Sequence, residues 1–310
     1  MNDMKLITDL TNLQQSSLLP SVATIGFFDG VHCGHRSLIG QVCRVAAERS
    51  LATMLVTFSA HPRLVMQADY QPRLLSTLEE KVRLLSQTGV DYCVPLHFTR
   101  ELATLSAHDF MQHVLRDQLK VHTLVIGYDH RFGHNRAECF EDYVRYGQEL
   151  GMEVIRAEAY QLDGVHVSSS VVRTLLDKGD IAMASHCMGY DYSLEGEVIG
   201  GQQIGRTLGF PTANLQMVDS LKIVPTDGVY AVRVHVDNEV YKGMLNIGCR
   251  PTIDEDVRRT IEVHLLHFEG NLYGKRLRIE FLRRIRGEQK FCNREALAQQ
   301  LRLDAEACEE

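Results

Sequence analysis

The chain has 310 residues, of which 45% are hydrophobic and 24% are charged, and its formal net charge is -7. This length suits two domains, and the composition is ordinary for a globular protein. The acidic balance argues against a general nucleic-acid-binding protein, which would usually be basic. The negative net charge does not exclude local basic patches that hold phosphate groups.

The eight cysteines are scattered and form no C-x-x-C pair, so neither a zinc site nor a thioredoxin-type motif is predicted. The first residues lack a basic segment followed by an apolar core, and no apolar run has membrane-spanning length. We therefore expect a cytoplasmic protein with free thiols, without a signal peptide or a membrane-spanning segment.

The first half of the chain alternates strand-like and helix-like segments. Short apolar, β-branched runs predict strands at 21–26, 51–58, 91–96, 123–127 and 153–159. Residues 37–49 have the pattern of an amphipathic helix. Ser76 is the predicted N-cap of a capping box, and Ser106 marks a weaker helix start. Strands separated by helices predict a parallel sheet covered on both faces, with ligands beyond the carboxyl ends of its strands.

After about Ser185, strand-like segments follow one another without long helices, which predicts a small antiparallel β-barrel or sandwich. These strands are placed at 193–199, 229–236, 239–247, 260–266 and 277–282. Val232, Val234 and Val236 alternate with polar residues, as in a half-buried strand. Asp237 and Asn238 tolerate left-handed geometry and are the predicted turn between two strands.

The chain ends in one predicted helix at 294–303, with Asn293 as its N-cap. The acidic tail 304–310 is expected to be solvated. The change of pattern near Ser185 predicts two domains, 1–186 and 187–310.

Residues 24–36 are the most informative segment, with the sequence TIGFFDGVHCGHR. Its glycines let the backbone approach an anion, and the following helix offers unpaired N–H groups. His32 and His35 can donate hydrogen bonds to phosphate oxygens, and either could be charged near neutral pH. The segment matches neither the P-loop nor the G-x-G-x-x-G motif. An ordinary turn with two incidental histidines is the alternative, and the H-x-G-H spacing favours a phosphate site.

Two further segments of the first half carry phosphate-binding side chains. Residues 127–136, with the sequence GYDHRFGHNR, follow a predicted strand, although a polar surface loop is an equal alternative. Residues 167–173, VSSSVVR, place three hydroxyls and Arg173 at a helix start, although an ordinary serine cap also explains them. Together the three segments predict transfer of a nucleotidyl group from ATP, with pyrophosphate leaving. Such chemistry depends on positioning and positive charge.

The second half has three polar segments. Residues 205–214, GRTLGFPTAN, present Thr212 and Asn214, which are hard ligands suited to magnesium or phosphate. Residues 246–252 form another polar turn. Glu262 is a candidate general base for a substrate hydroxyl. From periodicity alone, a position on the wet face of a strand is the favoured interpretation of Glu262.

In this order, the motifs resemble those of the bacterial bifunctional riboflavin kinase/FAD synthetase (FMN adenylyltransferase) family. They are TIGFFDGVHCGH, GYDHRFGHNR, VSSSVVR, GRTLGFPTAN, DGVY, NIGCRPT, IEVHLLHF and LYGKRLRIEFL. The resemblance implies an α/β nucleotidyltransferase domain with a Rossmann-like parallel sheet, then a small antiparallel β-barrel with a terminal helix. It implies that the barrel phosphorylates riboflavin to FMN and that the first domain adenylylates FMN to FAD.

The resemblance also implies site residues. His32, His35 and Glu262 are expected to be catalytic. The adenylyltransferase site is expected to bind ATP and phosphate through Gly26, Phe28, Asp29, Gly30, His32, His35, Asp129, Ser168, Ser169 and Arg173. The kinase site is expected to bind ATP and flavin through Gly205, Arg206, Gly209, Pro211, Thr212, Asn214, Asn246 and Arg250, with Thr212 and Asn214 on the metal.

The implied cofactor is Mg²⁺, with ATP as co-substrate and riboflavin, FMN and FAD as substrates or products. No nucleic acid and no membrane is expected as a partner, and assembly into a homo-oligomer is left open. The chain departs from the family pattern at Phe27, His130 and His267. The alternatives are a kinase with a silent first domain, a flavin-binding module without turnover, and an RNA-binding barrel, which the acidic charge disfavours.

Overall fold

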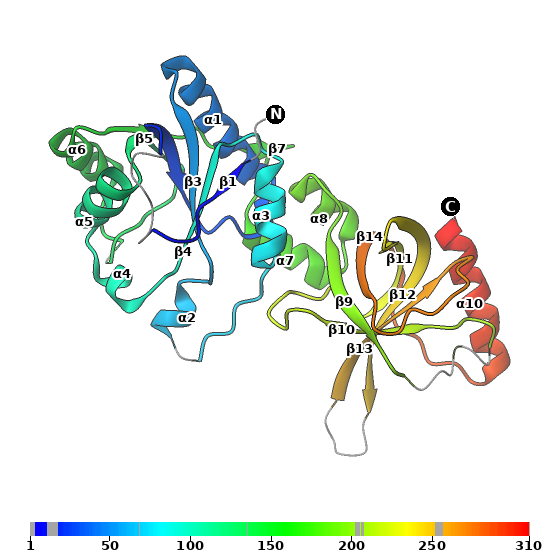
Figure 1. Ribbon diagram of the computed structural model, residues 1–310. Helices are drawn as coiled ribbons and strands as arrows, with labels where there is room; N and C mark the ends of the chain where they lie inside the picture. Colours follow the sequence, from blue (N-terminus) through cyan, green and yellow to red (C-terminus); the bar gives the residue numbers. More distant parts are fainter. Residues whose placement is uncertain are drawn as a thin grey trace. The chain divides into compact units, whose positions relative to one another are not determined.

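The computed structural model describes residues 4–10, 18–67, 69–134, 136–201, 205, 208–251 and 257–309. The chain divides into two compact units, Met1–Ser169 and Ser170–Glu310 (Figure 1). Helix α7 (Ser169–Lys178) begins at this division, and helix α8 (Ile181–Met188) spans the boundary predicted after residue 186.

The first unit contains a six-stranded sheet in the order β1-β4-β3-β2-β5-β6, and all of its neighbouring strands are parallel. The strands are β1 (Lys5–Leu6), β2 (Ser21–Ile25), β3 (Ala52–Phe58), β4 (Tyr92–Leu96), β5 (Val121–Ile126) and β6 (Glu153–Arg156). The predicted parallel α/β sheet is therefore confirmed. Strand β1 was not predicted, because two residues carry no periodic pattern.

The strand order reverses between β2 and β5. From β2 the chain adds β3 and β4 on one side, and β5 and β6 then form on the other side. Ligands of such sheets bind beyond the carboxyl ends of the strands, at the point of reversal. The segments after β2 and β5 are two of the three that the sequence predicted to bind phosphate.

Helices cover both faces of this sheet. On one face, α1 (Cys33–Arg49) and α3 (Leu78–Ser86) place Ile39 and Leu85 in a buried cluster with Leu55 of β3. On the other face, Met54 and Val56 pack in the cluster that includes helices η3 (Phe110–Gln118) and α6 (Phe140–Leu150). Shorter elements are η2 (Asp29–Val31), α2 (Arg63–Met66), α4 (Arg100–Thr104), α5 (Ala107–Asp109), β7 (Gln161–Leu162) and β8 (Val165–His166).

Helix α3 begins one residue later than predicted. Its N-cap is Thr77, whose hydroxyl accepts from the Glu80 N–H at 3.1 Å, and the Glu80 carboxylate accepts from the Thr77 N–H at 2.9 Å. Ser76 instead accepts a long-range hydrogen bond from the Gly30 N–H at 3.0 Å. The tertiary contact therefore decided which of two adjacent hydroxyls became the cap. Ser106 caps α5 as predicted.

The second unit contains a closed antiparallel barrel in the order β10-β13-β12-β11-β14-β9. Its strands are β9 (Ser193–Ile199), β10 (Ala213–Met217), β11 (Gly228–Val236), β12 (Glu239–Pro251), β13 (Val257–Leu265) and β14 (Arg276–Arg286). Five of the six match predicted strands. Strand β10 was not predicted, because Gly209 and Pro211 immediately before it obscure its short alternation. Ala213 and Leu215 are nevertheless buried.

The hairpin between β11 and β12 has the predicted turn. Val236 pairs with Glu239, and Asp237 has a φ of 54°, in the left-handed region. Val232, Val234 and Val236 are each at most 3% exposed, which confirms the predicted alternation.

The C-terminal helix α10 (Arg294–Glu309) includes the tail that was expected to be solvated, so that expectation was wrong. The Asn293 side chain accepts from the Ala296 N–H at 2.8 Å, as predicted for the cap. Asp304 is only 1% exposed and accepts from Arg286 at 2.7 Å, and Cys308 is buried against the barrel. The acidic composition of the tail predicted neither the apolar contacts of Ala305 and Cys308 nor the pairing of Asp304 with Arg286.

Replacing Asp304 with alanine should lower the free energy of unfolding by about 3 kcal/mol, because it leaves the Arg286 guanidinium unpaired in a partly buried position. Urea unfolding of the full chain, followed by circular dichroism, measures this change. The matched control is Glu306→Ala in the same helix, since Glu306 is exposed. Equal stability of the two variants would show that the ion pair does not fasten α10.

Candidate active sites

The segment after β2 turns sharply before α1 begins. Phe28, Gly30 and Val31 have φ values of 53°, 76° and 39°, so three of four consecutive residues are left-handed. A Cβ on Gly26 would lie 3.1 Å from the Phe28 ring, and Phe28 itself is 2% exposed. Gly26, Phe28 and Gly30 therefore shape this turn from within.

The turn is fixed by the buried carboxylate of Asp29. It accepts from the Leu75 N–H at 2.9 Å and from the Ser76 N–H at 3.1 Å. The Ser76 hydroxyl accepts in turn from the Gly30 N–H, and the Ser169 hydroxyl donates to the Asp29 carbonyl at 3.1 Å. Asp29 and Ser169, which were predicted to bind phosphate, thus both have a visible role in holding the turn.

His32 and His35 lie together at the N-terminus of α1. Their rings stack with centroids 3.7 Å apart, and His32 Nδ1 accepts from the His35 N–H at 3.3 Å as the helix N-cap. The edge of the Phe28 ring contacts His35 at a centroid distance of 5.2 Å. Two imidazoles beside the positive end of a helix make a favourable anion site.

Burial keeps His35 and His130 neutral. His35 Nδ1 and His130 Nε2 are buried, and neither has a hydrogen-bond partner among the described residues. Burial, and then the neighbouring His32 and His130, lower the pKa of His35 well below its usual value. Burial also lowers the pKa of His130 to about 4. His35 is therefore uncharged at neutral pH, whereas the sequence alone also allowed a charged imidazole.

The segment after β5 lines a cavity of about 320 Å³. Its walls include Tyr128, Asp129 and His130, and its far side includes Glu138 and Arg156. The Arg156 guanidinium lies 5.0 Å from the Tyr128 ring centroid. The predicted residue Asp129 is exposed at this cavity, and Asn135 of the same motif lies outside the described residues.

The third segment reaches the same turn. A Cβ on Gly34 would lie 3.2 Å from the Val167 carbonyl oxygen, which shows how closely residue 167 approaches the start of α1. Ser168 follows directly, and Ser169 contacts Asp29 as described above. Arg173 belongs to the second unit, so its part in this site stays a prediction.

Sequence reasoning missed Lys81 of α3, which is 3% exposed. Its ammonium group donates to the Phe27 carbonyl at 3.1 Å and to the Phe58 carbonyl at 2.8 Å, at the ends of β2 and β3. The signal was present, because Lys81 lies one helical turn before the buried Leu85 and thus on the inner face.

In the second unit, Glu262 lies in a row of polar side chains. Asn214 of β10 and Asn246 of β12 are its direct cross-strand partners, so the three side chains share one face of the barrel. The Thr212 hydroxyl donates to Glu262 Oε2 at 3.2 Å. Glu262 is only 8% exposed, so the wet-face interpretation was wrong. Thr212, just before β10, contacts Glu262 from outside its own strand, which periodicity along one strand does not show.

Glycines let backbone approach these side chains. A Cβ on Gly201 would collide with the Asn214 amide, and one on Gly248 would collide with the Glu288 carboxylate. The Phe210 N–H donates to the Gly205 carbonyl at 2.9 Å, which closes the loop before β10, and Gly209 has a φ of 85°. Arg206 lies outside the described residues.

A second cavity, of about 420 Å³, lies beside this row. It is lined by Val198, Pro211, Thr212, Ala213, Val263, Leu265, Phe268, Gly270, Asn271, Leu272 and Tyr273. Its walls are mostly apolar, and the Thr212 hydroxyl joins it to Glu262. A cavity with apolar walls and a few polar groups at one side suits an aromatic base attached to a polar chain.

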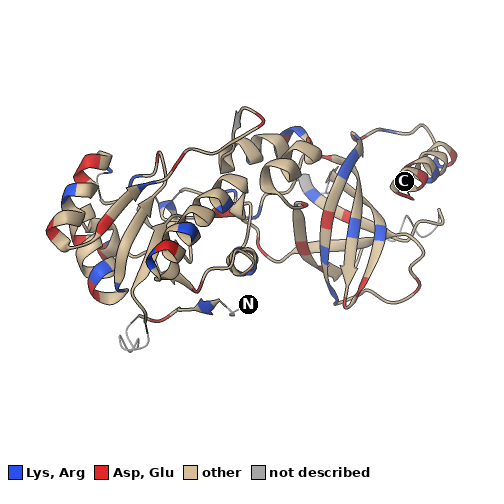
Figure 2. Cartoon of the chain, turned by 90° about the horizontal axis from the view of Figure 1, so that it is seen from above, with Lys and Arg blue, Asp and Glu red and all other residues tan. Residues whose placement is uncertain are grey.

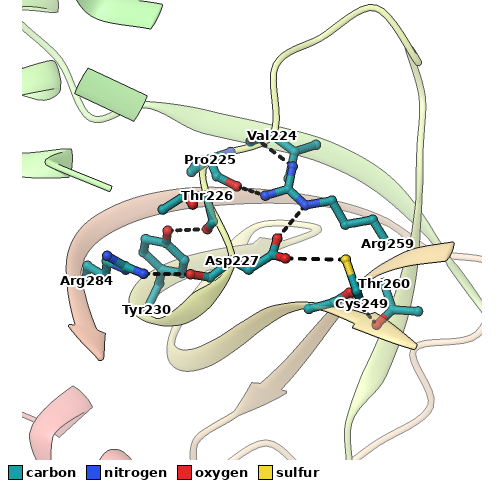
Figure 3. Close-up of polar contacts among 10 residues, drawn as sticks. Val224, Pro225, Thr226, Asp227, Tyr230, Cys249, Arg259, Thr260 and Arg284 are labelled. Atoms are coloured by element: carbon teal, nitrogen blue, oxygen red, sulfur yellow. Dashed lines mark hydrogen bonds and ion pairs between the residues drawn. The ribbon is translucent and has the colours of Figure 1, made fainter. Parts of the chain in front are cut away.

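Figure 3 shows the polar network that braces β12 and β13. Arg259 donates to Asp227 Oδ1 at 2.6 Å, to the Val224 carbonyl at 3.1 Å and to the Pro225 carbonyl. Cys249 Sγ donates to Asp227 Oδ2 at 3.4 Å, and this bond raises the pKa of the Cys249 thiol. The network anchors the two strands that carry Asn246 and Glu262. Arg250 lies in β12, and its side chain is outside the described part.

Known protein families match both halves of the chain. The FAD synthetase family model matches residues 14–171, and the riboflavin kinase family model matches residues 188–310. The bifunctional riboflavin kinase/FMN adenylyltransferase of Escherichia coli (strain K12) is 36% identical over 302 residues, covering 97% of this chain and 96% of that one. The protein of the same name from Bacillus subtilis (strain 168) is 35% identical, covering 96% and 94%.

One solved structure, named macrolide-efflux protein from Streptococcus pneumoniae, matches with a TM-score of 0.89 and 28% identity, and covers 99% of both chains. In the described part of this chain, no helix has both the length and the hydrophobicity that a membrane crossing requires. The family models place FAD synthetase before riboflavin kinase in the chain, and the names of the curated relatives state both activities. The chain belongs to the bifunctional riboflavin kinase/FMN adenylyltransferase family: it phosphorylates riboflavin to FMN with ATP in its C-terminal part, and adenylylates FMN to FAD in its N-terminal part.

Proposed function

We propose that residues 1–186 form the adenylyltransferase domain and residues 187–310 the kinase domain, each with the site residues named above. The observation that carries the assignment is the clustering of those residues. His32 and His35 stack at the sheet's point of reversal, and Glu262 lies between Asn214 and Asn246 on the barrel.

In the kinase, Glu262 is the general base. Its carboxylate removes the proton of the riboflavin 5′-hydroxyl, whose oxygen attacks the γ-phosphorus of ATP, and ADP leaves. Thr212 orients the carboxylate through its hydrogen bond, and Asn214 and Asn246 flank it. The apolar cavity beside Thr212 receives the adenine base. The polar groups around Glu262 thus form the reaction centre, and the apolar cavity beside Thr212 forms a separate binding surface.

The donor set also suits magnesium. The Thr212 hydroxyl and the Asn214 amide are oxygen ligands next to a carboxylate, and Mg²⁺ in such sites is held by few protein groups together with substrate phosphates. Among the described residues, no group of three or more His, Cys, Asp or Glu side chains forms a metal cage. When bound, the metal neutralises phosphate charge; Thr212 and Asn214 hold it.

In the adenylyltransferase, the FMN phosphate attacks the α-phosphorus of ATP, and pyrophosphate leaves. His32, His35 and the N-terminus of α1 hold the phosphates at the end of β2, and Asp129 lines the neighbouring cavity after β5. Because burial keeps its imidazole neutral, His35 acts on the phosphates as a hydrogen-bond donor and not as a full positive charge. Ser168 and Arg173 complete the proposed phosphate-binding set.

A cytoplasmic location and small-molecule partners complete the proposal. None of the eight cysteines, all of which lie in the described part of the chain, forms a disulfide, which supports a reducing compartment. Arginines on the strands of the barrel pair with carboxylates, as Arg278 does with Glu280 at 2.9 Å and Arg276 with Glu195 at 2.6 Å. Figure 2 shows charges of both signs along these strands, which supports substrates other than nucleic acid.

Glu262→Gln should lower FMN formation from riboflavin by about a hundredfold or more, because the amide cannot accept the hydroxyl proton. FAD formation from supplied FMN should be unchanged. Chromatography of a time course with riboflavin, ATP and Mg²⁺ separates the two products. Glu269→Gln, an exposed carboxylate further along the chain, is the control. Normal riboflavin phosphorylation by Glu262→Gln would exclude Glu262 as the base.

His35→Ala should stop the reaction at FMN, with FAD formation reduced by about a hundredfold, because a hydrogen-bond donor to the reacting phosphates is lost. The same time course measures this, and riboflavin phosphorylation in the same molecule reports intact kinase activity. His122→Ala, an exposed histidine of β5, should behave like the parent protein. Continued FAD production by His35→Ala would remove His35 from the mechanism.

A further inference from the structure

Lys81 is a buried cation at the edge of the adenylyltransferase site. It is 3% exposed, and its Nζ donates to the carbonyls of Phe27 and Phe58, 3.1 and 2.8 Å away. These carbonyls follow β2 and end β3, which are neighbouring parallel strands. The ammonium group therefore ties together two strand ends at the edge of the sheet where substrates bind.

The surroundings of Lys81 do not neutralise its charge with an ion pair. Its Nζ lies 4.2 Å from the Phe27 ring centroid, and it forms no ion pair with any described residue. Burial lowers the pKa of Lys81 to about 8, although the nearby Asp29 and Cys93 oppose this change. Burial raises the pKa of the Cys93 thiol to about 11, so the thiol is neutral. Keeping an ammonium group under these conditions is costly, which favours a functional reason.

The Phe27 carbonyl connects Lys81 to the phosphate-binding turn. This oxygen also accepts from the Thr57 hydroxyl at 3.1 Å, so two donors orient one peptide group. The next residue is Phe28, where the left-handed turn to His32 begins. The charge of Lys81 also reaches His35, because it contributes to the lowered pKa of that imidazole.

We propose that Lys81 is a positioning residue for FMN adenylylation: it fixes the turn that carries His32 and His35, and it places a positive charge beneath the phosphate groups. The inference rests on the proposed roles of these two histidines. Backbone carbonyls orient the ammonium group, so it needs no reorganisation when negative charge develops above it. The transferring phosphates supply negative charge in addition to that of the nearby Asp29 carboxylate.

The decisive variant is Lys81→Met, which keeps the length of the side chain and removes its charge and donors. We expect kcat for FMN adenylylation to fall about tenfold to a hundredfold, with a smaller change in KM for ATP. Riboflavin phosphorylation by the same molecules should be unchanged. Lys5→Met is the matched control, because Lys5 is an exposed lysine of the same unit. Thr57→Val, which removes only the second donor to Phe27, should show a smaller loss.

The pH profile separates the charge from a purely structural role. Lys81 loses its proton as the pH rises through about 8, so kcat/KM for adenylylation should decline above that pH in the parent protein. In Lys81→Arg the guanidinium stays charged, and the decline should move to higher pH. The titratable groups that face Lys81 are Asp29, Cys93 and His35. The pKa of Cys93 is raised to about 11 and the pKa of His35 is lowered well below its usual value, so neither group titrates near pH 8.

Parent-like kcat in Lys81→Met would overturn the proposal. An alkaline limb that stays unshifted in Lys81→Arg would do the same, and this result decides the matter if Lys81→Met does not fold. A different result tests the proposed roles of the histidines. Continued FAD production by His35→Ala would exclude those roles, even if Lys81→Met remained impaired.

Discussion

The adenylyltransferase site depends on one buried carboxylate. Asp29 accepts backbone N–H groups of Leu75 and Ser76, across 46 and 47 positions of the chain. Together with the bonds that Ser76 and Ser169 make to the same turn, these bonds offset the left-handed φ of Phe28 and Val31, which is costly for bulky residues. The turn, the stacked histidines and the site that they form all follow from that carboxylate.

The proposed kinase site meets a different constraint, because the Glu262 carboxylate is buried among partly buried polar groups of the barrel. Glu262 lies among Thr212, Asn214 and Asn246, each of which supplies a polar atom on the same face. A buried carboxylate is tolerated only with such neighbours. The Arg259 network holds the two strands in register, and the Arg286–Asp304 pair fastens the terminal helix. Rigidity outside the site thus supports positioning within it.

The two units show how far local patterns predict structure. Strands with several alternating or apolar residues were located within a few residues of their ends, and the turn at Asp237 was found from residue type alone. The errors occurred where a partner distant in the sequence decided the outcome. Thr77, and not Ser76, is the N-cap of α3, because the Ser76 hydroxyl accepts from the Gly30 N–H. The acidic tail is helical and packed, because its Asp304 pairs with Arg286.

The sequence by itself determined the fold class, the order of the two activities and most candidate site residues, because these depend on motifs whose spacing is local. Only the tertiary structure decided that His35 is neutral, that Glu262 is buried and that Lys81 reaches the ends of β2 and β3. Burial and pKa depend on what packs against a side chain from other elements. Such neighbours are distant in the chain, so no pattern along one segment contains them.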